Sequence, residues 1–80
     1  DEVAPQGSEA QVAAIEAAMA EVAEREAAAE KRARDFMAAE DHKAGVSHAQ
    51  EIFAAKQEKL MLDTELEIAR RKKNRLLMPQ

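Results

Sequence analysis

Large and small apolar side chains recur at alternating intervals of three and four residues along the first half of the chain. One helical face, the first stripe, contains the following residues: Val12, Ile15, Met19, Val22, Glu26, Ala29, Ala33, Phe36, Glu40 and Lys43. This spacing keeps a row of side chains directed at a neighbouring helix. Because one helix cannot bury such a row alone, the pattern predicts a second helix packed against it.

A second stripe begins after Gly45, in a different register. It contains Ile52, Ala55, Lys59, Leu62, Leu66, Ala69, Lys73 and Leu76. The register of the first stripe, continued past Gly45, would instead place Gln57, Thr64 and Arg71 on the contact face. The change of register therefore predicts two helices, with one continuous helix as the alternative. The large apolar members of both stripes are the predicted seam residues: Val12, Ile15, Met19, Val22, Phe36, Ile52, Leu62, Leu66 and Leu76.

Local signals set the expected boundaries of these helices. Ser8 and Ser47 are each followed three residues later by glutamine, which is a capping-box pattern. Gly45 favours a left-handed helix stop, and Pro79 lies beyond the last periodic residue. The expected segments are an extended tether over residues 1–7, a helix over 8–44, a turn over 45–47 and a helix over 48–78.

The distribution of charge predicts how the two helices pair. Four glutamates and no base lie between Ser8 and Glu24, whereas five bases and no acid lie between Arg70 and Arg75. A short connection favours antiparallel neighbours, and a reversal near Gly45 places residue i opposite a residue at about 92 − i. The basic segment then faces the acidic one, whereas a parallel homodimer would oppose like charges. The predicted fold class is all-α, an antiparallel two-helix hairpin resembling a coiled coil.

Composition limits how stable this hairpin can be by itself. The chain has 80 residues, and its 46% hydrophobic fraction includes 19 alanines, leaving 18 larger apolar residues. Burying such a small core provides little free energy beyond what is needed to offset the conformational entropy that the chain loses on folding. We therefore expect the isolated hairpin to be only marginally stable and to pack within something larger.

Four large apolar residues of the second helix lie away from its stripe. On a helical wheel Phe53, Leu60, Met61 and Ile68 occupy the flank and back of the helix. Aromatic residues and methionine are enriched in interface cores, so these four are the candidate partner-binding residues. Scattered exposed hydrophobic residues are the alternative interpretation, because every protein surface has some.

A basic patch near the end of the chain allows more than one interpretation. It consists of Arg70, Arg71, Lys72, Lys73 and Arg75. Clustered bases suggest nucleic-acid binding or a targeting signal. The net charge of −4 and the lack of an interleaved aromatic residue favour contact with acidic protein groups instead.

Candidate chemistry is sparse along the chain. There is no cysteine, and His42 and His48 are six residues apart across the turn, which is not a metal-ligand spacing on one helix. These histidines are expected to be solvated, with a pH-sensitive turn as the alternative. No phosphate-binding glycine loop or Ser–His–Asp set occurs. We expect no metal, no cofactor and no enzymatic activity.

The sequence favours a non-enzymatic helical structural or assembly subunit, partnered by other protein subunits of a larger complex. A regulatory or inhibitory protein that binds an enzyme reversibly, with Arg34, Phe36 and Met37 as anchors, is one alternative. A basic-tailed adaptor for nucleic acid or an anionic membrane surface is another. No apolar run is long enough to span a bilayer, so we expect a soluble or peripheral protein. The sequence leaves the compartment open; if starting at Asp1 rather than Met reflects removal of a transit peptide, an intracellular organellar matrix or stroma is compatible with it.

Overall fold

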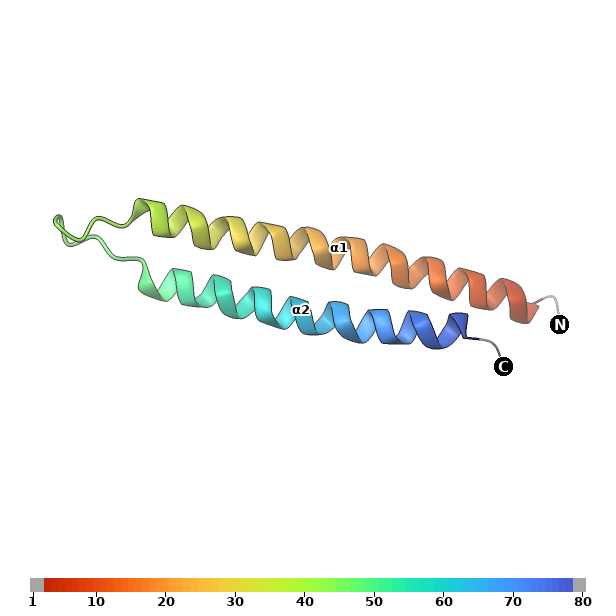
Figure 1. The fold of residues 1–80 in the computed structure, drawn as a ribbon. Helices are drawn as coiled ribbons and strands as arrows, with labels where there is room; N and C mark the ends of the chain where they lie inside the picture. Colours follow the sequence, from red (N-terminus) through yellow and green to blue (C-terminus); the bar gives the residue numbers. More distant parts are fainter. Residues whose placement is uncertain (1–2, 79–80) are drawn as a thin grey trace.

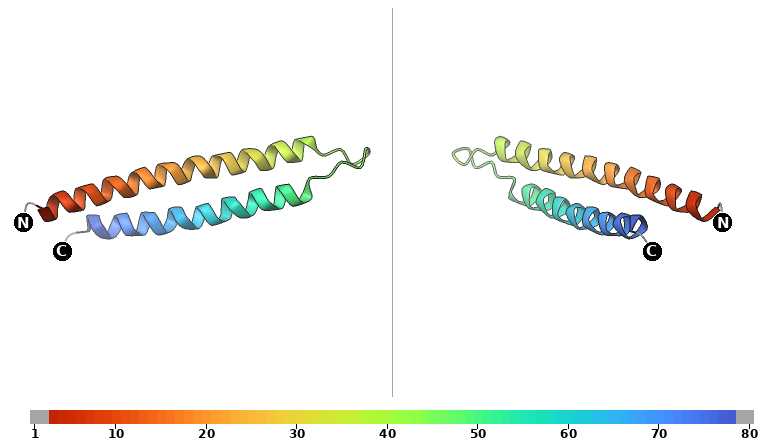
Figure 2. Two further views of the ribbon diagram at one scale, coloured as in Figure 1. Left: turned by 180° about the vertical axis from the view of Figure 1, so that it is seen from behind. Right: turned by 45° about the vertical axis from the view of Figure 1, so that its right-hand side comes forward.

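Two long helices lie side by side in opposite directions and are joined by one loop (Figure 1). The computed structural model describes residues 3–78, with α1 at Val3–Ala39 and α2 at Ala49–Leu77. The start of α1 and the end of α2 lie at one end of the rod, and the connecting loop lies at the other (Figure 2). The molecule measures 68 × 16 × 13 Å. The predicted all-α antiparallel hairpin is confirmed.

The first helix starts earlier than its sequence signals suggest. It begins at Val3, whereas the sequence predicts an extended tether over residues 1–7; residues 1 and 2 lie outside the described part of the chain. Pro5 is compatible with this start, because the amide hydrogen that it lacks would have no partner in the first turn. Ser8 therefore lies inside the helix, and its predicted role as the helix cap is wrong.

The connection between the helices is longer than the predicted turn. Helix α1 ends at Ala39 instead of residue 44, and the loop covers residues 40–48 rather than 45–47. Asp41 and Val46 exchange two backbone hydrogen bonds, with N···O distances of 3.0 and 2.8 Å. The Asp41 carboxylate also accepts hydrogen bonds from the amides of Lys43 and Ala44, at 3.1 and 3.2 Å. These bonds offer the backbone an alternative to another helical turn, which explains the early end of α1.

Gly45 completes this tight turn in the left-handed conformation. Its φ is 76°, and its amide donates to the His42 carbonyl at 3.3 Å. Residues 42–45 thus form a four-residue turn between the paired residues Asp41 and Val46, a turn length that is also common in β-hairpins. The sequence correctly marks Gly45 as a left-handed residue, but Gly45 belongs to the loop and not to the end of α1.

The start of α2 is supported by Glu40, the first residue of the loop. His48 is the N-cap residue, and its side chain makes no capping hydrogen bond. Its amide instead donates to Oε2 of Glu40, at 3.1 Å. The predicted capping box at Ser47 is therefore wrong. At the other end α2 stops at Leu77, and Met78 is extended with φ −71° and ψ 139°, as expected for a residue followed by proline.

The core is a narrow seam between the two helices, dominated by alanine. Among the hydrophobic residues within 8–78, only Ala29, Ala33, Ala55 and Leu62 are buried. The other first-stripe residues up to Glu40 and the other second-stripe residues are half-buried, whereas Lys43 is exposed in the loop. Alanine at the contact allows the helix axes to approach closely. The seam is thus thin, as expected from the composition.

Ion pairs between the helices define the register. Lys73 contacts Glu16, Lys59 contacts Glu26 and Arg32 contacts Glu58. The residue numbers of these pairs add to 89, 85 and 90, so residue i lies opposite a residue near 88 − i. The sequence predicts about 92 − i because it places the reversal at Gly45. The hydrogen-bonded turn centres the reversal between Lys43 and Ala44 instead.

Candidate partner-binding surface

The side of α2 that faces away from α1 carries a row of exposed apolar side chains. Phe53, Leu60, Met61 and Ile68 are 63%, 61%, 65% and 60% exposed. Leu62, only two residues from Leu60, is 1% exposed because it faces α1. The four candidate partner-binding residues therefore lie together along about four turns of one helix, outside the seam.

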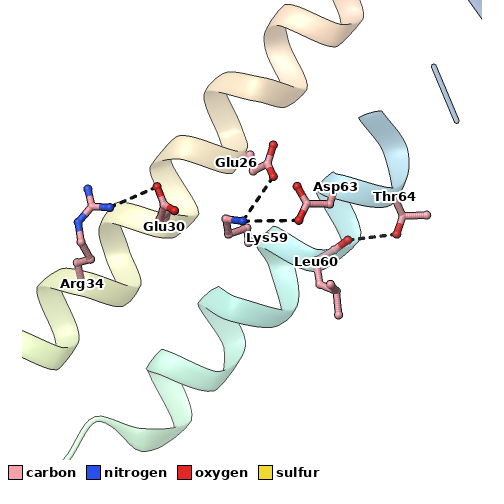
Figure 3. Close-up of polar contacts among 7 residues, drawn as sticks. All are labelled: Glu26, Glu30, Arg34, Lys59, Leu60, Asp63 and Thr64. Atoms are coloured by element: carbon pink, nitrogen blue, oxygen red, sulfur yellow. Dashed lines mark hydrogen bonds and ion pairs between the residues drawn. The ribbon is translucent and has the colours of Figure 1, made fainter. Parts of the chain in front are cut away.

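Two polar residues complete this surface. We call Phe53, Gln57, Leu60, Met61, Thr64 and Ile68 the outer face of α2. The Thr64 hydroxyl donates to the Leu60 carbonyl at 3.2 Å, and both residues lie away from α1 (Figure 3). Because this hydroxyl already has an acceptor, covering Thr64 would leave no unsatisfied donor. Gln57 is thus the remaining polar group that a partner would have to accommodate.

The predicted seam residues lie between the helices, on the opposite side of α2. Those of α1 and those of α2 are all half-buried except Leu62, which is buried. Their half-buried state follows from the absence of a third element over the groove in the described structure. The seam and the outer face are therefore two separate apolar surfaces of one helix.

A polar cluster interrupts the seam near its middle. The Lys59 ammonium lies 3.7 Å from the Glu26 carboxylate across the seam and 3.6 Å from Asp63 on its own helix (Figure 3). The Glu26 side chain is 17% exposed and that of Lys59 37%. Polar residues at seam positions favour one register over others, at some cost in stability. The Lys59 ammonium therefore already has carboxylate partners within the hairpin.

The basic patch is only partly engaged with α1. Lys73 reaches Glu16 across the seam, with an N···O distance of 3.0 Å. Arg70 and Arg71 instead pair with Glu67 on the same helix, at 2.6 and 3.5 Å. The contacts predicted from the sequence involve only acids of the first helix. Glu67 is nevertheless three and four residues from these arginines, which is the spacing expected for ion pairs within a helix.

The remaining two bases of the patch border an open groove at the end of the rod. This groove has a volume of about 470 Å³ and is lined by Gln11, Ala14, Ile15, Lys72, Arg75 and Leu76. Its floor is apolar and its rim is cationic. The groove is a continuation of the seam and not an enclosed pocket, so it offers no water-excluded site for catalysis.

The two histidines differ in their surroundings. The His48 ring packs against Phe36, with centroids 5.3 Å apart and planes tilted by 44°. Its Nδ1 lies 3.9 Å from the Glu51 carboxylate. His42 is exposed in the loop. The structure therefore places the two histidines in separate environments, and within residues 3–78 no group of three His, Cys, Asp or Glu side chains is arranged to hold a metal ion.

Comparison with protein-family models, with curated proteins and with solved structures gives no match. Neither described helix contains a stretch that is long and apolar enough to cross a membrane.

Proposed function

We propose that this chain is a non-enzymatic helical structural subunit that packs into a larger protein assembly through the outer face of α2. The observation that carries this proposal is the exposure of Phe53, Leu60, Met61 and Ile68, each at least 60% exposed on one side of one helix. Single exposed hydrophobic residues are ordinary, whereas several large ones on the same side of one helix indicate an interaction site.

The thin seam supports the same proposal. Leu62 is the one large side chain among the four buried residues of the core. A hairpin with so little buried apolar surface gains stability from any partner that binds only the folded state. Covering the outer face would add four large side chains to the apolar surface that the fold removes from water.

The alternative of a basic-tailed adaptor has less support. Arg70, Arg71 and Lys73 already contact carboxylates of this chain, which compete with phosphate groups for them. Lys72 and Arg75 remain at the rim of the groove. Two such bases make a weaker electrostatic site than the five that the sequence suggests.

Site-specific photocrosslinking in the native source tests the proposed function. A photoreactive residue at Phe53 or at Leu60 should form a defined adduct with a protein subunit, because both side chains lie on the outer face. The same residue at Ala17, which is exposed on α1 away from the seam, is the matched control. Equal labelling at all three positions would argue against a specific docking face.

The double substitution Phe53→Glu with Leu60→Glu supplies the complementary evidence. Both side chains are exposed, so the hairpin should keep its helicity, measured by circular dichroism. Association with the captured subunit should be lost, because two charges would then have to be buried without partners. Unfolding of the hairpin would mean that these residues stabilise the fold itself and would contradict the proposal.

A further inference from the structure

The outer face of α2 has the same pattern of residue types when it is read in either direction. Its centre lies between Leu60 and Met61, two apolar neighbours. Moving outward, Gln57 and Thr64 are both polar and equally distant from the centre, and Phe53 and Ile68 are both large, apolar and equally distant. In each of these pairs the residue numbers add to 121. A surface that meets its own copy across a two-fold axis requires this kind of self-complementarity.

We propose that the partner on this face is a second copy of the chain, packed antiparallel through α2 about a two-fold axis between Leu60 and Met61. This inference rests on the proposed function and names the occupant of the same surface. The antiparallel arrangement places Leu60 and Met61 of both copies in one central apolar layer. Gln57 then lies at the level of the other copy's Thr64, and Phe53 at the level of its Ile68.

Charge complementarity at the ends supports the same orientation. In this arrangement Arg71 lies at the level of Gln50 of the second copy, and Arg75 at the level of its Val46. The segment over residues 70–75 carries five bases and no acid, and it faces residues 46–51 of the second copy, which carry one acid and no Lys or Arg. The acid is Glu51, which lies at the level of Arg70 because these two residue numbers also add to 121. Two such contacts form in the dimer, one at each end.

A parallel arrangement of the same two faces is disfavoured by the same charges. It would place the segment 70–75 of one copy beside the segment 70–75 of the other, so that five bases oppose five bases. It would also put Phe53 against Phe53 and Gln57 against Gln57, which groups the polar residues in one layer. Only the antiparallel pairing combines matching apolar layers with attraction at both ends. The product is a flat layer of four helices, in which the two copies of α2 lie at the centre and the two copies of α1 at the edges.

Sedimentation equilibrium of the full chain tests the self-association. The wild-type chain should reach twice the 8.8 kDa mass of one copy as its concentration rises. Leu60→Glu should raise the dimer dissociation constant by at least about tenfold, because it places two charges in the central layer. Ala17→Glu, on the exposed side of α1, is the matched control and should leave the mass unchanged. A monomer at every concentration, with helicity intact, would overturn the proposal.

Disulfide crosslinking then tests the orientation, since the chain has no native cysteine. Leu60→Cys should link to its own copy, because the two positions adjoin the two-fold axis. Phe53→Cys alone and Ile68→Cys alone should not link, because each is 15 residues, or about 22 Å along the helix, from the level of its own copy. A mixture of the two single variants should give the mixed dimer. Self-linking of Phe53→Cys and of Ile68→Cys would show parallel packing and would overturn the proposal.

The outcomes separate this inference from the proposed function. A monomeric chain that still forms a specific adduct at Phe53 with a different protein overturns self-association and leaves the docking role standing. A monomer without any such adduct contradicts both. A dimer that Leu60→Glu dissociates and Ala17→Glu does not supports both.

Discussion

At the scale of single residues, two leucines that are close neighbours in sequence differ greatly in solvent exposure. Leu62 is 1% exposed and lies between the helices, whereas Leu60 is 61% exposed on the outer face. The other buried residues of the seam are Ala29, Ala33 and Ala55, whose side chains are small. Leu62 therefore supplies much of the buried apolar volume. The two leucines should therefore respond very differently to truncation.

Truncating Leu62 should destabilise the hairpin far more than truncating Leu60. We expect Leu62→Ala to lower the free energy of unfolding by about 2–3 kcal/mol, near the low end for core leucines because the thin seam can partly collapse. Leu60→Ala should change it by less than about 0.5 kcal/mol in the monomer, as for other surface positions. Urea unfolding followed by circular dichroism at low protein concentration measures both values. Similar losses for the two variants would contradict the assignment of Leu62 to the seam.

At the scale of the helices, the ends depend on contacts that sequence motifs do not reveal. The amide of His48, the first residue before α2, donates to Glu40, which lies eight residues earlier in the chain. Ser47 and Gln50 have the spacing of a capping box, yet α2 has no side-chain cap at its N-cap residue. The Phe36 ring against His48 adds a second contact at this corner. The corner is thus held by residues from both sides of the loop.

Removing the Glu40 carboxylate should weaken the start of α2. We expect Glu40→Ala to cost about 1 kcal/mol, the usual loss when a helix-capping acceptor is removed. Ser47→Ala, the matched control, should stay within about 0.5 kcal/mol because Ser47 is exposed and does not cap α2. Chemical denaturation gives both differences, and amide exchange at His48 should accelerate in Glu40→Ala only. A larger loss of stability for Ser47→Ala than for Glu40→Ala would mean that the Ser47 capping box stabilises the start of α2.

At the scale of the whole molecule, polar contacts across a thin apolar seam select one way of pairing the helices. Lys59 and Lys73 both lie on the second stripe, and each meets a glutamate of α1. Alanine-rich helices can slide along one another with little change in packing. The charged groups penalise such slippage, because a shifted register would separate Lys59 from Glu26.

Replacing the central polar pair by leucine should therefore raise stability and reduce specificity. We expect Glu26→Leu with Lys59→Leu to increase the melting temperature, since apolar replacements of half-buried ion pairs are often stabilising. Spin labels at Ala18 and Lys72, on one flank of the hairpin, should then give a broader distance distribution than in the otherwise wild-type chain. The two quantities are measured by circular dichroism and pulsed EPR. If the melting temperature falls and the spin-label distance distribution stays narrow, the Glu26–Lys59 pair only stabilises the hairpin and does not select its register.

The sequence alone determined the two helices, their antiparallel order and the separation of seam from outer face, because side-chain periodicity and helix propensity act locally and repeat over many turns. It did not determine the corner, where Asp41 and Val46 pair across the loop and Glu40 binds the amide of His48. Nor did it determine which bases reach α1. These features depend on the distance between groups that only the folded chain brings together. When the point of chain reversal shifts by two residues, the residue opposite any given position changes by four. The tertiary structure therefore decided the register, the helix ends and the partners of the charged residues.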